Sequence, residues 1–341
     1  MKNLLLLIII LNVQYTFGQN VIEVEKPIIP IHHVKIFETL DTSLVKNIEV
    51  LEKKLKEANS NFEVYQIAKY LGYFYTINDQ KEESIELWNS LNKLGIILPF
   101  RMSENPHPQY LSNYLNNDSF MKFIKFNEKL KNEASDSSKV EYFVNLPKDY
   151  NPQRKYPLII VLHGRIGNFY ATYTNWKSSV IRDSCISIYA KGKIIVGSFT
   201  HSFGSTGIGD IKEIYRQVAQ KYPINNEQVI LAGQSQGGNL SIKLACDSIT
   251  ASGLLLAFPV KPNDFDFEKA KEIKEKGVRV IMICGEKDYK FFEGQLELAR
   301  LLDSAHVESR VFKYPELGHR FPDDFSEQID RGIFYLIKRE Q

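Results

Sequence analysis

The stretch Val229-Ile-Leu-Ala-Gly233-Gln-Ser235-Gln-Gly237-Gly238 carries the strongest structural signal in this chain of 341 residues. Its apolar start predicts a buried strand, and the apolar residues after Gly238 predict a helix. A Gly-x-Ser-x-Gly pattern between a strand and a helix indicates a turn so tight that side chains at the two glycines would collide. The turn holds the Ser235 hydroxyl clear of the sheet, at a helix N-terminus that favours negative charge. Ser235 is therefore the candidate nucleophile, and an ordinary structural turn is the alternative.

Strand and helix patterns alternate around this turn from about residue 138 to the end of the chain. The predicted strands are Val140–Leu146, Leu158–Leu162, Ile194–Phe199, Val229–Ala232, Gly253–Phe258, Val278–Ile283 and Ser309–Tyr314. Helical spacing predicts helices near 171–184, 208–221, 237–248, 266–276, 291–304 and 323–338. Solidly apolar strands that alternate with helices are typical of a parallel sheet covered on both faces. The predicted fold class is α/β.

Two later strand ends carry side chains that suit nucleophilic catalysis. One strand leads into Gly285-Glu-Lys-Asp288, and the last leads into Gly318-His319. An imidazole accepts a proton near neutral pH, and a carboxylate beside it holds the required tautomer. We predict His319 as the base and Asp288 as its partner, with Glu286 as the competing acid. No other histidine follows a late strand in a Gly-His pair; these six are His32, His33, His107, His163, His201 and His306.

These motifs resemble the α/β-hydrolase superfamily over about residues 138–341. Gly233-Gln-Ser235-Gln-Gly237-Gly238 is similar to the nucleophile motif of the phospholipase/carboxylesterase-like branch of serine esterases. The resemblance implies a catalytic triad in the order Ser235, Asp288, His319, with each member at the carboxyl end of a strand. It implies the α/β-hydrolase fold, with a mostly parallel sheet flanked by helices, preceded here by a small all-helical domain.

The resemblance also locates an oxyanion hole. Leu158-Ile-Ile-Val-Leu-His163-Gly164-Arg165 places His-Gly directly after an apolar strand, where such enzymes build half of this site. The backbone N–H groups of Arg165 and Gln236 would then bind the tetrahedral oxyanion. Ile166 stands where a small residue is common in the family motif, and we expect it to narrow the acyl side of the cleft. His163 itself is expected to be structural.

Cofactor chemistry finds no support in the motifs. The glycines of 200–210 lack the spacing of a dinucleotide fingerprint, and a loop at the cleft rim is the expected structure. No metal-ligand spacing occurs, and we predict no cofactor and no metal. The three cysteines, Cys185, Cys246 and Cys284, give no disulfide framework, although Cys185 could pair with one of the others.

The N-terminal half has a different periodicity. Residues 40–132 show helical stripes, with Asp41 and Asp79 as expected helix N-caps and Gly95 as an expected helix end. Leu71-Gly72-x-x-Tyr75, with Trp88 downstream, resembles one tetratricopeptide-type helix hairpin. Such units normally need about three copies to be stable alone. We therefore expect a small helical domain packed on its neighbour, joined by a polar linker over 132–139. A module that binds a protein partner is the alternative.

The first residues have the layout of a secretory signal peptide. Met1-Lys2-Asn3 is cationic, Leu4 to Leu11 is apolar, and Thr16-Phe17-Gly18 puts small residues before a cut at Gln19. A membrane anchor is the alternative, but the apolar run is too short for a bilayer, which needs about 20 residues. Residues 1–18 are therefore predicted to be removed, and the mature protein to be secreted or periplasmic.

The net charge of +2 leaves no field that would attract nucleic acid or an anionic membrane. The motifs instead predict acyl transfer to water through an acyl-enzyme, with a small ester as substrate. Only about 20 residues separate Phe258 from Val278, so no large lid is expected. The alternatives are a prolyl-oligopeptidase-type peptidase, whose β-propeller the helical half does not resemble, and a partner-binding protein with a relic hydrolase domain.

Overall fold

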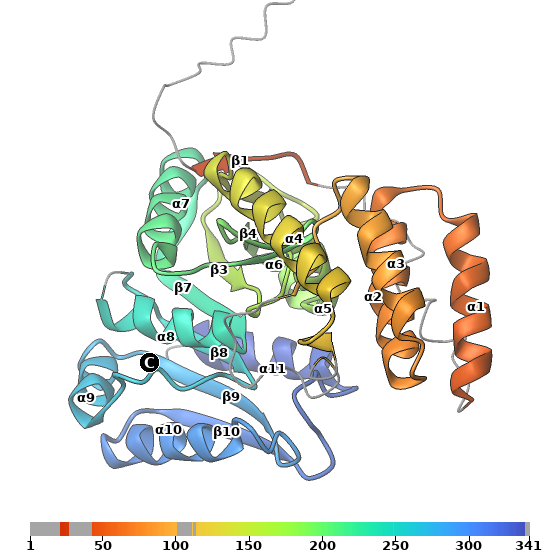
Figure 1. Ribbon diagram of the computed structural model, residues 1–341. Helices are drawn as coiled ribbons and strands as arrows, with labels where there is room; N and C mark the ends of the chain where they lie inside the picture. Colours follow the sequence, from red (N-terminus) through yellow and green to blue (C-terminus); the bar gives the residue numbers. More distant parts are fainter. Residues whose placement is uncertain (1–20, 27–42, 101–110, 112–113, 248, 338–341) are drawn as a thin grey trace, which may run out of the picture.

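The computed structural model describes residues 21–26, 43–100, 111, 114–247 and 249–337 (Figure 1). Its centre is an eight-stranded sheet in the order β1-β2-β4-β3-β7-β8-β9-β10. The strands are β1 Val21–Glu23, β2 Val140–Asn145, β3 Tyr156–Leu162, β4 Ile186–Lys191, β7 Ile224–Gln234, β8 Gly253–Ala257, β9 Arg279–Gly285 and β10 Ser309–Tyr314. All neighbouring strands run parallel except β2 with β4. This arrangement confirms the predicted α/β-hydrolase fold.

Helices cover both faces of the sheet because its central strands are apolar on both sides. One buried cluster lies under α7 Gly207–Lys221, α8 Gln236–Asp247, α9 Phe267–Glu275 and α10 Phe292–Ser304. The opposite cluster lies under α5 Phe169–Asn175, α6 Ser179–Ser184 and α11 Phe325–Ile337. The chain segment between β8 and β9 contains the short helix α9 and is no longer than the sequence predicted.

Two predicted elements of this half differ from the structure. The predicted strand Ile194–Phe199 is not in the main sheet: β5 Ile194–Gly197 pairs only with β6 Thr200–Ser202, as an antiparallel hairpin. β4 occupies that position in the main sheet instead. Its short β-rich run, which ends just before Gly192, was not among the predicted strands. The predicted helix 171–184 is two helices, since the Ser178 hydroxyl accepts from Ile181 N–H and starts α6 anew.

The N-terminal half contains α1 Leu44–Glu57, α2 Asn61–Ile77, α3 Lys81–Lys93 and α4 Asp118–Asp136. Gly95 follows α3 with a positive φ of 76°, as predicted, but Asp79 does not cap this helix. Asp79 has a φ of 57°, and Gln80 precedes the helix without a side-chain cap. Residues 132–136, expected to begin a linker, are the last turn of α4. Gly72 of α2 lies against the indole of Trp88 in α3.

These helices pack on the β5–β6 hairpin rather than on the main sheet. The hydroxyls of Tyr65 and Thr200 share a buried hydrogen bond of 3.0 Å. The ring centroid of Phe199 lies 5.1 Å from that of Phe62 and 5.4 Å from that of Tyr65. Ser198 N–H donates to Ile97 O at 2.9 Å, which joins the backbones of the two halves. Figure 1 shows α1 to α3 beside the sheet region and α4 running back toward it.

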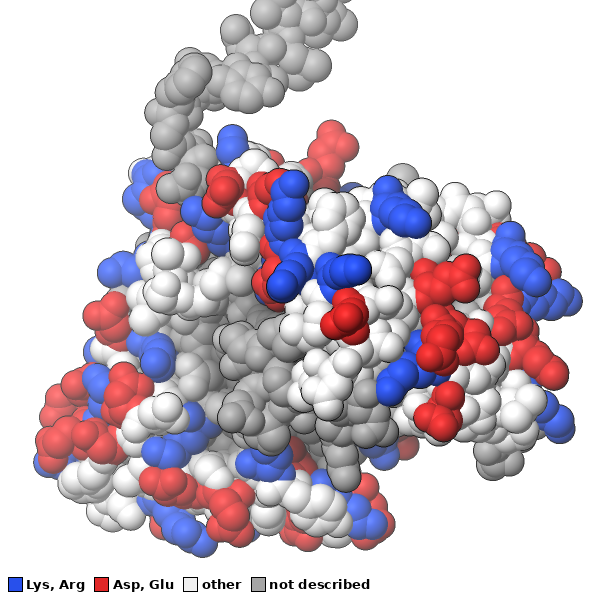
Figure 2. Space-filling view, in the orientation of Figure 1, with Lys and Arg blue, Asp and Glu red and all other residues white. Residues whose placement is uncertain are grey.

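The remaining predictions concern the chain ends and the cysteines. Residues 1–18 and Asp41 lie outside the described residues. Within the described part, no helix is long and apolar enough to cross a membrane. All three cysteines are buried and unpaired, so Cys185 forms no disulfide with Cys246 or Cys284. On the face seen in Figure 2, acidic and basic side chains are mixed, in keeping with the small net charge.

Candidate active site

The turn at Ser235 has the backbone geometry that its sequence predicts. Ser235 joins β7 to α8 with a φ of 52°, a conformation that strains a residue with a side chain. A Cβ at Gly233 would lie 2.4 Å from the carbonyl carbon of Gly237, and one at Gly237 would lie 2.1 Å from Leu162 O. Neither position can therefore hold a larger residue. The N–H of Ser235 donates to Ala257 O of β8 at 3.1 Å, which anchors the turn to the next strand.

Asp288 and His319 are in direct contact. His319 Nδ1 lies 2.6 Å from Asp288 Oδ2, and the Asp288 side chain is buried. Gln295 Nε2, from the first turn of α10, donates to the same Oδ2 at 3.0 Å. Glu286, the competing acid, is exposed. The sequence does not predict this role of Gln295, because no pattern distinguishes a glutamine seven residues after Asp288 from other helix residues.

Aromatic rings connect this pair to the nucleophile. The ring of Phe291 lies 5.0 Å from that of His319, and Phe291 also lines the pocket that contains Ser235. The ring of Phe258, which follows β8, lies 4.7 Å from His319 on another side. Asp288 therefore contacts His319 directly, whereas Phe291 both packs on the His319 ring and lines the pocket that contains Ser235. Since Nδ1 is taken by Asp288, Nε2 is the ring nitrogen left to exchange a proton with a hydroxyl.

The two residues predicted for the oxyanion hole lie beside Ser235. Arg165 and Gln236 line the same pocket, and a Cβ on Gly164 would lie 3.5 Å from that of Ser235. Gln236 is the first residue of α8, and its side-chain oxygen accepts from Ser202 Oγ at 2.9 Å. Ile166 is half-exposed. The turn after β3 and the start of α8 therefore face the nucleophile from two sides.

His163 is buried beneath this turn and does not reach the pocket. Its Nε2 accepts from Gly192 N–H at 3.0 Å, so the proton is on Nδ1, which donates to Gly164 O at 2.6 Å. Burial lowers the pKa of His163 from 6.5 to about 4, and its ring stacks on Phe203 at 4.3 Å. A neutral imidazole of this kind holds the loop in place, which agrees with the structural role predicted for it.

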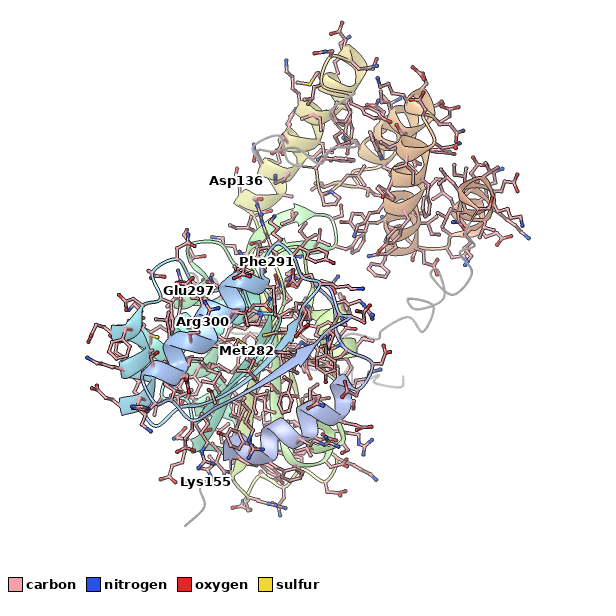
Figure 3. All side chains as sticks on the ribbon, turned by 90° about the horizontal axis from the view of Figure 1, so that it is seen from below. Asp136, Lys155, Met282, Phe291, Glu297 and Arg300 are labelled. Carbon is pink, nitrogen blue, oxygen red and sulfur yellow. The ribbon has the colours of Figure 1, made fainter. Side chains whose placement is uncertain are left out.

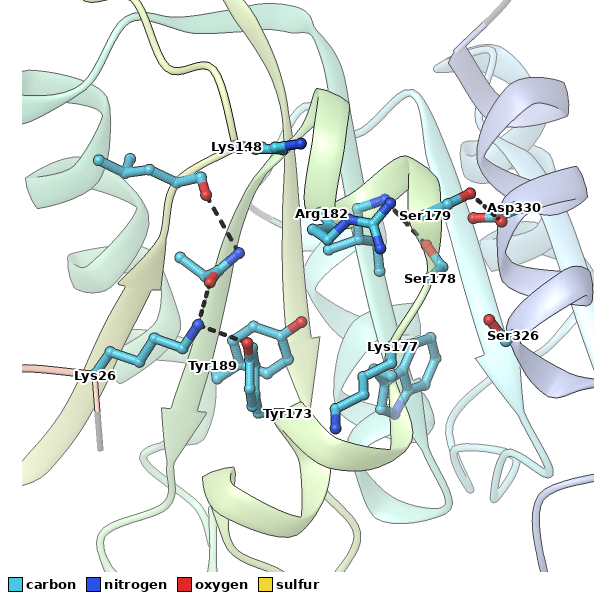
Figure 4. Close-up of a pocket in the computed structure, with 14 residues that line it drawn as sticks. Lys26, Lys148, Tyr173, Lys177, Ser178, Ser179, Arg182, Tyr189, Ser326 and Asp330 are labelled. Carbon is cyan, nitrogen blue, oxygen red and sulfur yellow. Dashed lines mark hydrogen bonds between the residues drawn. The ribbon is translucent and has the colours of Figure 1, made fainter. Parts of the chain in front are cut away.

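Two pockets of similar size open on this half of the molecule. The pocket at Ser235 has a volume of about 680 Å³. The second, of about 650 Å³, is lined by Lys26, Lys148, Tyr173, Arg182 and Asp330 among others (Figure 4). None of the five predicted site residues lines the second pocket. Among the described residues, no group of three or more His, Cys, Asp or Glu side chains could hold a metal ion.

No protein-family model and no curated protein matches this chain. Among solved structures, an uncharacterized protein from Bacillus cereus matches with 18% identity and a TM-score of 0.50, over 86% of this chain and 94% of that one. Residues 138–341 are only 204 of 341 residues, so this likeness extends into the N-terminal half.

Carboxylesterases are also among the structural neighbours. One from Bacillus cereus has 14% identity and a TM-score of 0.45, over 60% of this chain and 97% of that one. One from Mesorhizobium loti has 18% identity and a TM-score of 0.43, over 52% of this chain and 88% of that one. Likeness at these identities concerns the fold. The tetratricopeptide-like character of the N-terminal hairpin is not tested by these comparisons and stays a prediction.

Proposed function

We propose that this protein is a serine hydrolase that cleaves carboxylic esters with Ser235 as nucleophile, His319 as base and Asp288 as its partner. The observation that carries the proposal is the contact between His319 Nδ1 and buried Asp288. Phe291 packs on the His319 ring and lines the pocket that contains Ser235, whose backbone is strained. A free hydroxyl is a weak nucleophile, and a strained turn beside an oriented imidazole is the arrangement that activates it.

The reaction divides into two half-reactions. His319 Nε2 takes the proton from Ser235 Oγ as the oxygen attacks the ester carbonyl, and then gives it to the departing alcohol. Water, activated by the same imidazole, then releases the acid from the acyl-enzyme. The N–H groups of Arg165 and Gln236 would hold the oxyanion in both steps; losing one such donor typically costs about 10²–10³ in rate. Asp288 holds the imidazole in the required tautomer and stabilises the imidazolium that forms.

Labelling with a fluorophosphonate probe tests the proposal directly. The wild-type protein should label at Ser235 and hydrolyse short-chain esters. Ser235→Ala should abolish labelling and reduce kcat/KM by about 10⁴ or more, with the fold retained. Ser252→Ala is the matched control, because its hydroxyl lies near Val229 at the opposite end of these strands. An unlabelled wild-type protein would instead favour a binding protein with a relic hydrolase domain.

A further inference from the structure

Among the residues that the structure describes, basic side chains and no acidic ones line the pocket at Ser235. Its lining residues are Lys131, Arg165, Ile194, Ser202, Gly204, Ser235, Gln236, Asn239, Lys243, Val260, Lys261, Asn263 and Phe291. Each of the four cations comes from a different segment: α4, the turn after β3, α8 and the loop after β8. A concave site with charges of one sign concentrates the electrostatic potential inside it.

The cations lie at graded distances from the nucleophile. Asn239 and Lys243 are one and two helical turns beyond Ser235, so Lys243 is about 12 Å from it along α8. Val260 N–H donates to Ser235 O at 3.2 Å, which places Lys261 next to the nucleophile turn. Lys131 approaches from the other half of the chain. Figure 3 labels Asp136 at the carboxyl end of α4 and Phe291 at the start of α10, and both elements contribute to this pocket, through Lys131 and Phe291.

The acids that neutralise these lysines lie outside the pocket. Lys131 pairs with Glu128 at 3.1 Å, Lys243 with Asp264 at 3.4 Å and Lys261 with Glu297 at 3.3 Å. The side chains of Asp264 and Glu297 are 62% and 56% exposed, whereas that of Lys261 is 15% exposed. Exposed ion pairs stabilise a protein by only about 0–1 kcal/mol. An anion inside the pocket would therefore compete with exposed carboxylates at Lys243 and Lys261, and with the half-buried Glu128 at Lys131.

Resting on the proposed function, we infer that the natural ester carries an anionic group, a carboxylate, phosphate or sulfate, that Lys131, Lys243 and Lys261 recognise. A neutral ester would remove water from these cations and bring no negative charge into the pocket, which costs free energy. Because Lys131 belongs to α4, the helical half supplies part of the specificity. The same chemistry can reside on the acyl or the alcohol part of the substrate.

Two matched pairs of esters distinguish those sources. On the acyl side, para-nitrophenyl hydrogen adipate is compared with para-nitrophenyl hexanoate. On the alcohol side, para-carboxyphenyl acetate is compared with para-carboxamidophenyl acetate. In one pair the anionic ester should have a kcat/KM about tenfold higher or more at low salt, and about 0.5 M NaCl should reduce that ratio. The variant Lys131→Gln with Lys243→Gln should lower the ratio severalfold, while Lys261 and Arg165 remain in the pocket.

The control for the loss of two positive charges is the variant Lys212→Gln with Lys271→Gln, which should keep the wild-type ratio. Each of these lysines forms an ion pair with an acid on the surface, Lys212 from α7 and Lys271 from α9. Ratios near one in both pairs, from an enzyme that hydrolyses all four esters, would overturn the anionic substrate and leave the hydrolase intact. An unchanged preference in the Lys131 and Lys243 variant would overturn the assignment to these two lysines. Failure to hydrolyse any ester, with no fluorophosphonate labelling, would remove the proposed function itself.

Discussion

The two halves of this molecule hold their residues in place by different means. In the α/β half, the backbone itself fixes the Ser235 turn: Gly233 and Gly237 approach other backbone atoms so closely that only one turn geometry fits. In the helical half, side chains decide the position: Tyr65 and Phe62 pack on a hairpin more than 130 residues away in sequence. The proposed nucleophile and the walls of its pocket therefore have separate structural origins. The Ser235 turn is local, whereas the pocket wall that α4 supplies depends on long-range packing.

Within the α/β half, the largest expected effect is a loss of kcat when Asp288 is replaced. If Asp288 orients His319 as proposed, Asp288→Asn should lower kcat by about 10⁴, because the amide would stabilise the wrong tautomer. Glu286→Gln is the matched control, since this exposed acid is two residues away. Steady-state ester hydrolysis measures both variants. Equal losses in the two would contradict the choice of Asp288.

The sequence predicts residues that local structure positions better than residues that long-range packing positions. Ser235 and Asp288 follow buried strands with unbroken apolar runs, and His319 follows the half-exposed edge strand β10 within a Gly-His pair. Because these strands are parallel, their carboxyl ends lie at one edge of the sheet. Gln295 and Lys131 carry no comparable signal, because helix residues reach the site only through the packing of their helix. The misplaced strand 194–199 has the same cause: an apolar run shows burial, but not whether a main sheet or the helices of another segment cover it.

The second prediction is that removing the helical half lowers the stability of the α/β half, because the two halves pack on each other. A cut at residues 137–138, just beyond α4, removes the partners of Phe199 and Thr200. The fragment 139–341 should lose about 3–5 kcal/mol of unfolding free energy, comparable to the loss of a buried aromatic contact and its hydrogen bonds. Calorimetry of the fragment and of the full chain measures the difference. A hydrolase transition at an unchanged temperature would show instead that the helical half is an independent module.

Two buried histidines predict a smaller effect, on the pH dependence of stability. Burial lowers the pKa of His163 to about 4 and that of His201 to about 3, from 6.5. Between pH 6.5 and about 4, the unfolded chain therefore binds protons that the folded protein does not. Stability should fall as the pH drops through this window, by at most about 1.4 kcal/mol per pH unit for each histidine.

Urea unfolding between about pH 7 and pH 4.5 tests this linkage. His163→Asn should flatten the dependence by removing one of the two contributions, whatever its effect on absolute stability. His306→Asn, at an exposed turn, is the control and should keep the wild-type slope. An unchanged slope in His163→Asn would mean that this imidazole is protonated in the folded protein, contrary to its acceptance of the Gly192 N–H.

The smallest effect isolates a single contact between the halves. Tyr65→Phe removes the hydroxyl that shares a buried hydrogen bond with Thr200, and should cost about 1 kcal/mol. The matched control is Tyr75→Phe, which removes a hydrogen bond of 2.6 Å to Glu52 inside the helical half. Both changes weaken the helical half, but only the first weakens its attachment to the β5–β6 hairpin, whose residues Ile194 and Ser202 line the pocket that contains Ser235. Tyr65→Phe should therefore accelerate hydrogen exchange at Thr200 and Ser202, and Tyr75→Phe should not. Identical exchange in the two variants would mean that the hairpin keeps its place without the helices, and that the pocket wall is as local as the nucleophile turn.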